Sequence, residues 1–338
     1  MSDGTQTTHL VRGSRLLPAK GFLTIAISTV ILFVVAAIFA PSSVSGGAVQ
    51  GMLPFAAVLA IVGLGQMLVV QQGGIDLSVP GAVSLTVVIV SHYPNGVDSK
   101  LPVAILIALA YCIGAGVLNG FLVGRLGLNS IIATLGTNAL LYGAVLGISG
   151  GIPRSTTRAL NQIATGRTLG IPHSVIFALA CLLIVALLLK RTAAGRRFEA
   201  AGANRAAARA TGLRVRTHNV LAFIWAQLLY CIAGIVLAGI ILQPTAFQGD
   251  AYLLPSVAVV VLGGTSLLGG RGFPVSTVIA ALFLSQLDQF VLALGVPYAI
   301  QTLVQAAALA AGVAVYTLDW RAIRARFTGQ RRTAALAT

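Results

Sequence analysis

Acidic side chains within apolar sequence are the residues of this chain best placed to carry chemistry. Asp76 lies at the edge of the second long apolar run, and Asp288 lies well inside a run near the C-terminus. An acid at the centre of a membrane helix costs about 2.5–3.5 kcal/mol, so Asp288 is expected to face a cavity or a partner. A proton relay normally uses several buried acids, and the sequence places only Asp288 near a helix centre.

Uncharged amides inside the apolar runs are the second group of candidates. In helix bundles such amides often serve only as hydrogen bonds between helices, and that interpretation stays open. The alternative is a polar translocation pathway, with Gln301 as a further amide beside the last two runs. The pathway candidates are Gln66, Asn119, Asn138, Gln286, Asp288, Gln289 and Gln305, and Gln227 is another amide within a run.

Residues for catalysis or metal binding are not gathered anywhere in the sequence. The four histidines are scattered at the ends of segments, and the three cysteines lie inside apolar runs without metal-ligand spacing. The glycine-rich stretch 259–272 is not a phosphate loop, because no Gly-Lys-Ser/Thr follows it. We therefore expect no catalytic residue, no metal and no cofactor, and a membrane-embedded enzyme is the third choice of function.

Composition requires lipid as the solvent of this chain. Of its 338 residues 57% are hydrophobic and 9% are charged, and its mean hydropathy is +0.94. A soluble domain carries about 25% charged residues. The formal net charge is +15, but the charges sit in loops and tails beside apolar runs, so we expect no nucleic-acid partner.

The apolar runs predict an all-α integral membrane protein with about ten transmembrane segments. A span needs about 20 apolar residues. The first run is longer than the core of a secretory signal and is read as an uncleaved helix. Two of the segments, 77–92 and 254–270, are short and flanked by Gly and Pro. The candidate spans are 22–40, 53–71, 77–92, 101–124, 130–149, 173–190, 218–242, 254–270, 273–294 and 298–318.

Basic residues predict the orientation of these segments. With the N-terminus inside, 18 of the 22 Lys and Arg fall on the cytoplasmic side, and both termini are expected there. The domains expected are a basic cytoplasmic N-terminus (1–20), a membrane domain (21–318) with a cytoplasmic loop at 190–217, and a basic, partly disordered cytoplasmic tail (319–338).

Two glycine-rich stretches interrupt the expected helices. Residues 71–81 read QQGGIDLSVPG, in which two glycines break the helix, Pro80 suits a first helical turn, and Asp76 or Ser78 would cap it. The simpler interpretation is an interfacial turn, but broken helices also line cavities in membranes. The residues assigned to these gating motifs are Gly73, Gly74, Asp76, Ser78, Gly263, Gly264, Thr265, Ser266, Gly269 and Gly270.

The segment from Lys190 to Arg216 is the longest charged stretch between two apolar runs. Asn204 is a good N-cap, RAAARAT favours helix, and Gly212 is a natural stop, so a short helix is expected between them. Its basic residues are explained equally well by simple anchoring at the cytoplasmic side. The capped helix as a unit favours a protein partner, and its candidate residues are Gly202, Asn204, Arg205, Ala208, Arg209 and Gly212.

These segments together resemble the sugar-transporting permeases of bacterial ABC importers, the ribose/xylose/arabinose/galactoside group of the branched-chain-amino-acid/sugar permease superfamily. The resemblance rests on GIDLSV (74–79), IIATLGT (131–137), GRRFEAAGANRAAARATGLRV (195–215) and AVVVLGGTSLLGGRG (258–272), and it covers about residues 50 to 318. Two positions depart from the family pattern. Pro80 stands where Gly is common, and Asp288 with Gln289 stands where paired asparagines are frequent.

The resemblance implies a permease subunit in the bacterial cytoplasmic membrane that works with several partners. These are cytoplasmic ATPase subunits that bind ATP and Mg, an extracytoplasmic solute-binding protein, and a second permease subunit, identical or paralogous, within membrane lipid. It also implies that residues 204–212 dock on the ATPase. The expected function is import of a monosaccharide or similar polar solute by alternating access. An ion-coupled secondary transporter is the alternative.

Overall fold

Helices form nearly all of the computed structural model, which describes residues 17–297, 299–300, 302–304, 306–307 and 310. Within this part, seven helices are long and apolar enough to cross a membrane, so the chain is a multi-pass membrane protein. They are α1 (Leu17–Phe39), α2 (Gly46–Gln71), α4 (Leu101–Gly120), α5 (Ser130–Ser149), α7 (His173–Arg191), α10 (Val215–Ile240) and α12 (Pro274–Ala293).

Two further apolar helices are too short for a simple span. They are α3 (Val79–His92) and α11 (Leu253–Leu262). The expected segment 254–270 thus ends as a helix at Leu262, because Gly263 and Gly264 follow and Gly264 has a φ of +87°. Nine of the ten expected segments correspond to a helix. The tenth, 298–318, lies largely outside the described residues.

Several small elements connect these helices. The sequence predicted α9 (Arg205–Ala210) but none of the others. They are η1 (Pro41–Val44), η2 (Asp98–Lys100), the π-helical turn η3 (Phe121–Arg125), α6 (Arg158–Thr165), the antiparallel pair β1 (Arg167–Thr168) and β2 (Ile171–Pro172), α8 (Ala193–Ala203) and η4 (Asp250–Tyr252).

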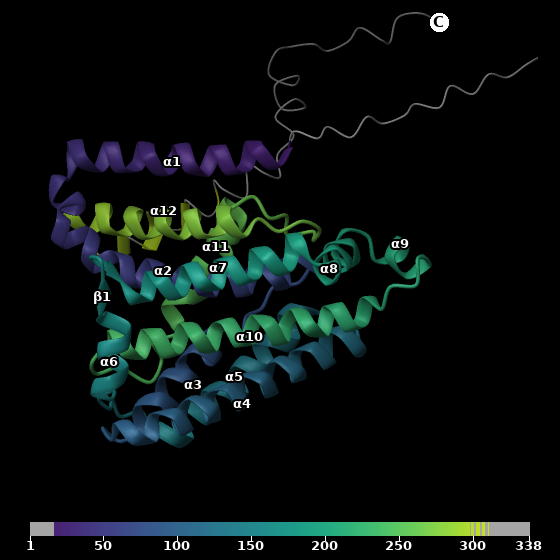
Figure 1. Ribbon diagram of the computed structural model, residues 1–338, viewed down its shortest axis with the longest axis horizontal. Coiled ribbons are helices and arrows are strands. Elements are labelled where there is room, and N and C mark those ends of the chain that lie inside the picture. Colours follow the sequence, from purple (N-terminus) through teal and green to yellow (C-terminus); the bar gives the residue numbers. More distant parts are fainter. Residues whose placement is uncertain (1–16, 298, 301, 305, 308–309, 311–338) are drawn as a thin grey trace, which may run out of the picture.

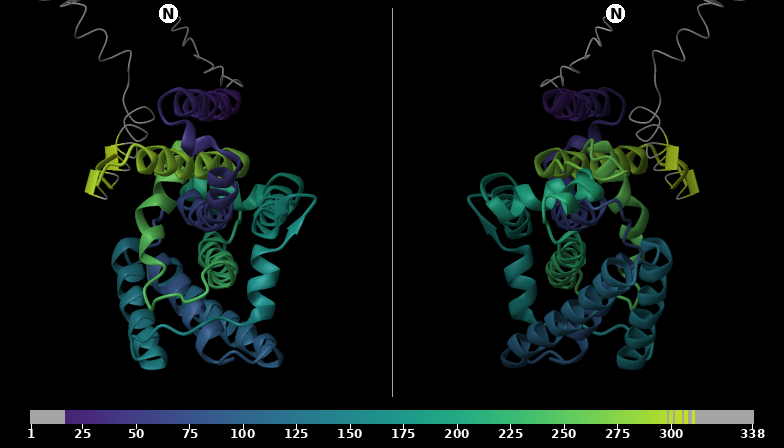
Figure 2. Two further views of the ribbon diagram at one scale, coloured as in Figure 1. Left: turned by 90° about the vertical axis from the view of Figure 1, so that its left-hand side faces the viewer. Right: turned by 90° about the vertical axis from the view of Figure 1, so that its right-hand side faces the viewer.

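The long helices run roughly side by side, with the connecting elements at the two ends of the bundle (Figure 1). α8 and α9 lie at one end, whereas α6 and β1 lie at the other. α2 and α10 are the central helices, and α10 packs on α2, α3 and α4 (Figure 2). α1 packs mainly on α12, and most of its apolar side chains are exposed, as expected for a helix facing lipid.

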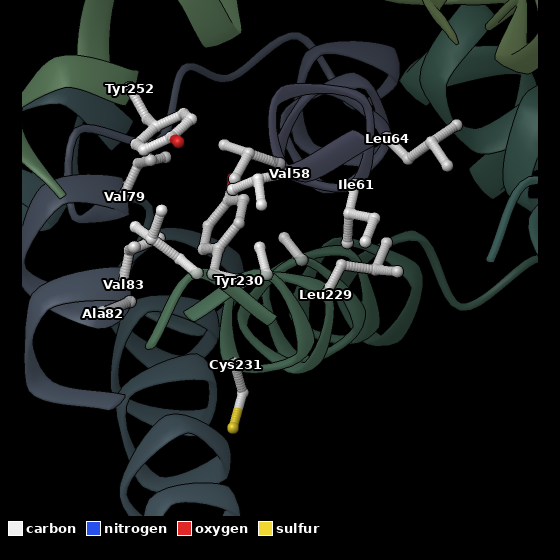
Figure 3. Packing of buried hydrophobic residues seen from close by; sticks show 14 of the residues in the cluster. Val58, Ile61, Leu64, Val79, Ala82, Val83, Leu229, Tyr230, Cys231 and Tyr252 are labelled. Carbon is white, nitrogen blue, oxygen red and sulfur yellow. The ribbon is translucent and has the colours of Figure 1, made fainter. Parts of the chain in front are cut away.

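The core is built where α2, α3 and α10 meet. Tyr230 points from α10 toward α2 and lies near Val58 and Val83 (Figure 3). A Cβ on Gly65 would lie 2.6 Å from the Tyr230 ring, so only glycine lets the two helices approach this closely. The buried core therefore holds α3 in place between α2 and α10. This short helix begins within the sequence motif GIDLSVPG.

Candidate functional site

The chain turns back on itself after α2 and re-enters the bundle before α3 begins. Gly73 has a φ of +72°, which favours glycine, and the N–H of Gly74 donates to the carbonyl of Val69 at 3.2 Å. The turn brings Asp76 beside Gln66 of α2. With its amide oriented to satisfy its neighbours, Gln66 donates to the Asp76 carbonyl at 3.2 Å and accepts from the Asp76 N–H at 3.3 Å. Residues 72–78 are thus a re-entrant segment.

A buried polar cluster surrounds this segment. Oδ1 of Asp76 accepts hydrogen bonds from the main-chain N–H of Ser78, at 2.8 Å, and from its hydroxyl. The Ser78 oxygen accepts from Nδ2 of Asn119 at 2.9 Å and from Nε2 of Gln227 at 2.7 Å. All four side chains are fully buried. The cluster therefore joins the re-entrant segment to α4 and α10.

The prediction that Asp76 or Ser78 caps α3 is wrong, because neither side chain accepts a hydrogen bond from an N–H group of the helix. Ser78 is the N-cap residue, but its side chain accepts no hydrogen bond from the helix. Asp76 instead binds the N–H of Ser78, one residue before the helix starts. In the described part of the chain the hydrogen-bond partners of the Asp76 carboxyl, Ser78 and Gln227, are uncharged, so hydrogen bonds rather than an ion pair hold it.

One face of α5 holds the re-entrant segment along its length. Ser130 accepts from the N–H of Ile75 at 3.1 Å, Thr134 accepts from that of Leu77 at 2.8 Å, and Asn138 accepts from that of Gly81 at 2.8 Å. Residues four apart lie on the same face of a helix. These three side chains therefore form a ladder. Two of them satisfy N–H groups of the non-helical segment, and Asn138 satisfies one in the first turn of α3, groups that would otherwise be unpaired in a membrane.

The same face of α5 also contacts the start of α11. The hydroxyl of Tyr142, four residues beyond Asn138, donates to Oδ1 of Asp250, and its ring packs edge-on against Phe247 at 5.1 Å. The N–H of Gly249 donates to the hydroxyl of Ser84 at 2.9 Å. The N-terminal ends of the two short helices thus lie together beside α5.

A second close arrangement forms at the end of α2, where the three sequence motifs meet. The carbonyl of Gln71 accepts from the N–H of Gly270 at 2.9 Å, and Nε2 of Gln72 donates to the carbonyl of Phe198 at 2.9 Å. Nη2 of Arg205 donates to the carbonyl of Gln72. We call residues 71–73, 198–205 and 268–272 the junction.

Glycines make this close approach possible. A Cβ on Gly202 would lie 2.0 Å from the carbonyl oxygen of Gln71, and one on Gly269 would lie 2.8 Å from that of Gly202. Burial raises the pKa of Glu199 in α8, and the positive charges of Arg271 and Lys190 oppose that rise. α8 therefore lies within electrostatic reach of the glycine-rich loop and the end of α7.

The predicted capped helix is confirmed in its local geometry. Oδ1 of Asn204 accepts from the N–H groups of Ala206 and Ala207, both at 3.0 Å. Gly212 follows the helix with a φ of +80°. Ala208 is buried, whereas Arg209 is exposed and, among the described residues, forms no hydrogen bond or ion pair.

The remaining candidates on the chain's C-terminal side are spread out. Thr265 is buried and accepts from the N–H of Phe273 at 3.4 Å, and Ser266 accepts from that of Leu268 at 3.2 Å. Gln286 is fully buried on α12, which packs on α1, α2, α7 and α11, and its amide has no hydrogen-bond partner among the described residues. Asp288 and Gln289 are half-buried on the same helix, and Gln301 and Gln305 lie outside the described residues.

Sequence reasoning did not assign a role to several residues of these sites. Gln71 and Gln72 stood inside the motif without a function, and Gln227 and Tyr230 were not placed near Asp76. The fourfold spacing of Ser130, Thr134, Asn138 and Tyr142 was a detectable signal, since it marks one helical face. Gln227 and Tyr230, the residues contributed by α10, had no such local signal.

Comparison with known proteins identifies the family. Residues 48–313 match the family model of the branched-chain amino acid transport system permease component, which is well over half of the chain. This chain belongs to that family. It is thus a permease component of the ABC-transporter type, and its relatives are transport subunits rather than enzymes.

The permease is similar to several curated proteins over most of its length. It is 33% identical to the ribose import permease protein RbsC of Escherichia coli (strain K12) over 91% of this chain and 98% of that protein. It is 32% identical to a probable ABC transporter permease protein, y4mJ, of Sinorhizobium fredii over 81% and 82% of the two chains. It is 38% identical to the autoinducer 2 import system permease protein LsrC of an Enterobacter species over 68% and 67%. No solved structure matches it.

Proposed function

We propose that this permease is the membrane subunit of an ATP-driven importer for a monosaccharide or a similar polar solute. The observation that carries the proposal is the junction. It joins α8 and α9, which lie outside the membrane helices, to the re-entrant segment between α2 and α3 through Gln72. A force applied to α9 would therefore reach the end of α2, a central helix, where the re-entrant segment begins.

The proposed movement is a rigid-body displacement of α8 and α9 driven by ATPase subunits. ATP and Mg would bind those partner subunits and not this chain. Gln72 is hydrogen-bonded to α8, and Gln71 is hydrogen-bonded to the loop 268–272. The displacement would therefore move the re-entrant segment. The α5 ladder and the Asp76 cluster would then transmit this movement to α4, α5 and α10. Alternating access would follow from two packings of these helices.

The substrate class rests on the relatives and on the polar groups inside the membrane. The similar proteins are named for import of ribose and of autoinducer 2. The described interior offers amides and hydroxyls rather than cations, which suits a neutral, hydroxyl-rich solute. Asn119, Asn138 and Gln66, together with Gln286, Asp288 and Gln289 of α12, are the proposed route.

The proposed topology has ten spans with both termini in the cytoplasm of a bacterial inner membrane. Eight Lys and Arg lie between Lys190 and Arg216, at the end of the bundle that carries α8 and α9. The positive-inside rule assigns this end to the cytoplasm. The opposite end, with α6 and the β1–β2 hairpin, would meet an extracytoplasmic solute-binding protein. A second permease subunit would complete the channel.

Uptake into membrane vesicles tests the proposal. The full chain is co-produced with candidate ATPase and solute-binding proteins from its own organism, and uptake of radiolabelled candidate sugars is followed with ATP supplied on the cytoplasmic side. We expect uptake that requires ATP and persists when ion gradients are collapsed. Uptake that follows an ion gradient without ATP would favour the secondary transporter instead.

A further inference from the structure

A deep apolar furrow runs along the bundle between α7 and α10. Both helices pack on α2, but they leave a space of about 370 Å³ between them, which α8 closes at one end. This volume is within the range of pockets that hold a ligand. Its lining includes Leu68 from α2, Ile184 and Leu188 from α7, Phe198 from α8, and Leu221 and Trp225 from α10.

The furrow offers almost no free polar group to an occupant. Thr192 donates to the carbonyl of Leu188 at 2.6 Å and accepts from the N–H of Gly195 at 3.0 Å, and Nδ1 of His218 donates to the carbonyl of Arg214 at 3.0 Å. Nε2 of His218 and the indole N–H of Trp225 are the polar atoms of these lining side chains that remain for an occupant. A sugar in this space would therefore lose most of its hydrogen bonds to water without replacement. An alkyl chain forms no hydrogen bonds with water and would therefore lose none.

The furrow has the length of one membrane leaflet. On α7 it extends from Cys181 to Thr192, which at 1.5 Å per residue is roughly 16 Å. The hydrocarbon of a bilayer is about 30 Å thick, or roughly half that per leaflet. Ile184, Leu188, Leu221 and Trp225 are substantially exposed, so the furrow opens toward the surrounding lipid.

Positive charge gathers at the closed end of the furrow. Lys190 and Arg191 lie directly between lining residues Leu189 and Thr192, and Arg196 and Arg197 lie between Gly195 and Phe198. All four are exposed. A cluster of this kind at the membrane surface attracts anionic headgroups.

We propose that the furrow between α7 and α10 binds one anionic phospholipid of the surrounding bilayer, with an acyl chain along Ile184, Leu188 and Leu221 and its phosphate at Lys190 and Arg191. The two halves of such a lipid match the two halves of the site, an apolar channel of leaflet length and a basic rim. Since α8 forms both the wall of the furrow and part of the junction, the bound lipid would brace the element that receives the movement of the ATPases.

Native mass spectrometry of the full permease tests this proposal in nanodiscs of phosphatidylglycerol and phosphatidylethanolamine in equal amounts. We expect the wild type to retain phosphatidylglycerol selectively. Removing both rim charges with Lys190→Gln and Arg191→Gln should lower that selectivity roughly 25-fold, at about fivefold per cation. Ile184→Trp should fill the furrow and abolish retention of either lipid.

Control variants carry changes of the same kind elsewhere on the protein surface. Arg125→Gln removes an exposed cation at the end of η3, and Leu106→Trp enlarges an exposed side chain on α4; both should retain lipid as the wild type does. Wild-type retention in both furrow variants would overturn the proposal. Efficient disulfide-linked dimers of Leu221→Cys in native membranes would also overturn it, because they would assign the furrow to contact with a second copy. The three native cysteines are buried and should not cross-link.

Discussion

The guanidinium of Arg205 donates a hydrogen bond to the main-chain carbonyl of Gln72, so that the first residue of α9 contacts the first residue after α2. The two residues are 133 positions apart. Arg209, the second cation of α9, forms no hydrogen bond or ion pair among the described residues. The two arginines, equivalent by sequence spacing, therefore have different tasks in the structure.

Replacement of Arg205 should uncouple transport. Arg205→Ala removes the bond to Gln72 and should reduce ATP-driven uptake at least tenfold, because a charge-assisted hydrogen bond contributes about 1.5–3 kcal/mol. Arg209→Ala changes the charge of the same helix equally at a residue outside the junction, and so it serves as the control for the loss of charge. Uptake and ATP hydrolysis measured together in vesicles check this. Equal uptake by the two variants would remove Arg205 from the proposed coupling route. The Arg209→Ala variant would still test whether α9 docks on the ATPase.

An added methyl group at Gly202 should wedge the junction apart. Gly202→Ala places a Cβ 2.0 Å from the carbonyl oxygen of Gln71, where backbone on both sides has little freedom to yield. Overpacking of this kind costs about 1–3 kcal/mol. Gly136→Ala on α5 is the control, since nothing lies within 4 Å of its added Cβ. Thermal unfolding in detergent, followed by circular dichroism, should show a lowered midpoint for the first variant alone.

The α5 ladder offers a test with two neighbouring threonines. Thr134→Val removes the acceptor of the Leu77 N–H and should cost about 1–3 kcal/mol, the penalty of an unpaired buried donor. Thr137 is also buried on α5, but its hydroxyl has no hydrogen-bond partner among the described residues. Thr137→Val should therefore be neutral or stabilising. Chemical unfolding of both variants checks the difference, and equal losses of stability would show that the ladder is not what holds the re-entrant segment.

Local sequence patterns predicted the elements better than their contacts. The capped helix was predicted because Asn204 and Gly212 act within a few residues of themselves, and the apolar runs were found because lipid imposes a length. α8 was missed because its buried residues are Phe198, Gly195 and Ala201, too few and too small to give a periodic apolar signal, and its packing on α7 and α2 is not visible in the sequence.

Convergence in space was beyond the sequence. The sequence did not show that Gly202 and the glycines of 268–272 meet. Gly202 and Gly269 are each small so that another backbone can approach, whereas Gly272 lies against the side chain of Gln71. In the same way Gln227 resembled any other amide in an apolar run. Its role at the Asp76 cluster depends on how α10 is rotated against α3, and no local rule sets that rotation.

The charge of Asp76 distinguishes the two classes of transport. Asp76→Asn keeps an oxygen that accepts from the Ser78 N–H and hydroxyl, and the amide it introduces meets Gln227 only at the longer 3.4 Å contact. We expect this variant to fold with a stability within about 1 kcal/mol of the wild type and to keep ATP-driven uptake, since the proposed role is structural. Asp76→Ala leaves the Ser78 donors unpaired in a fully buried site and should cost about 1–3 kcal/mol. Thermal unfolding and vesicle uptake measured on both variants separate the two effects. Loss of uptake by a stably folded Asp76→Asn variant would mean that the negative charge itself takes part in transport, as an ion-coupled mechanism requires.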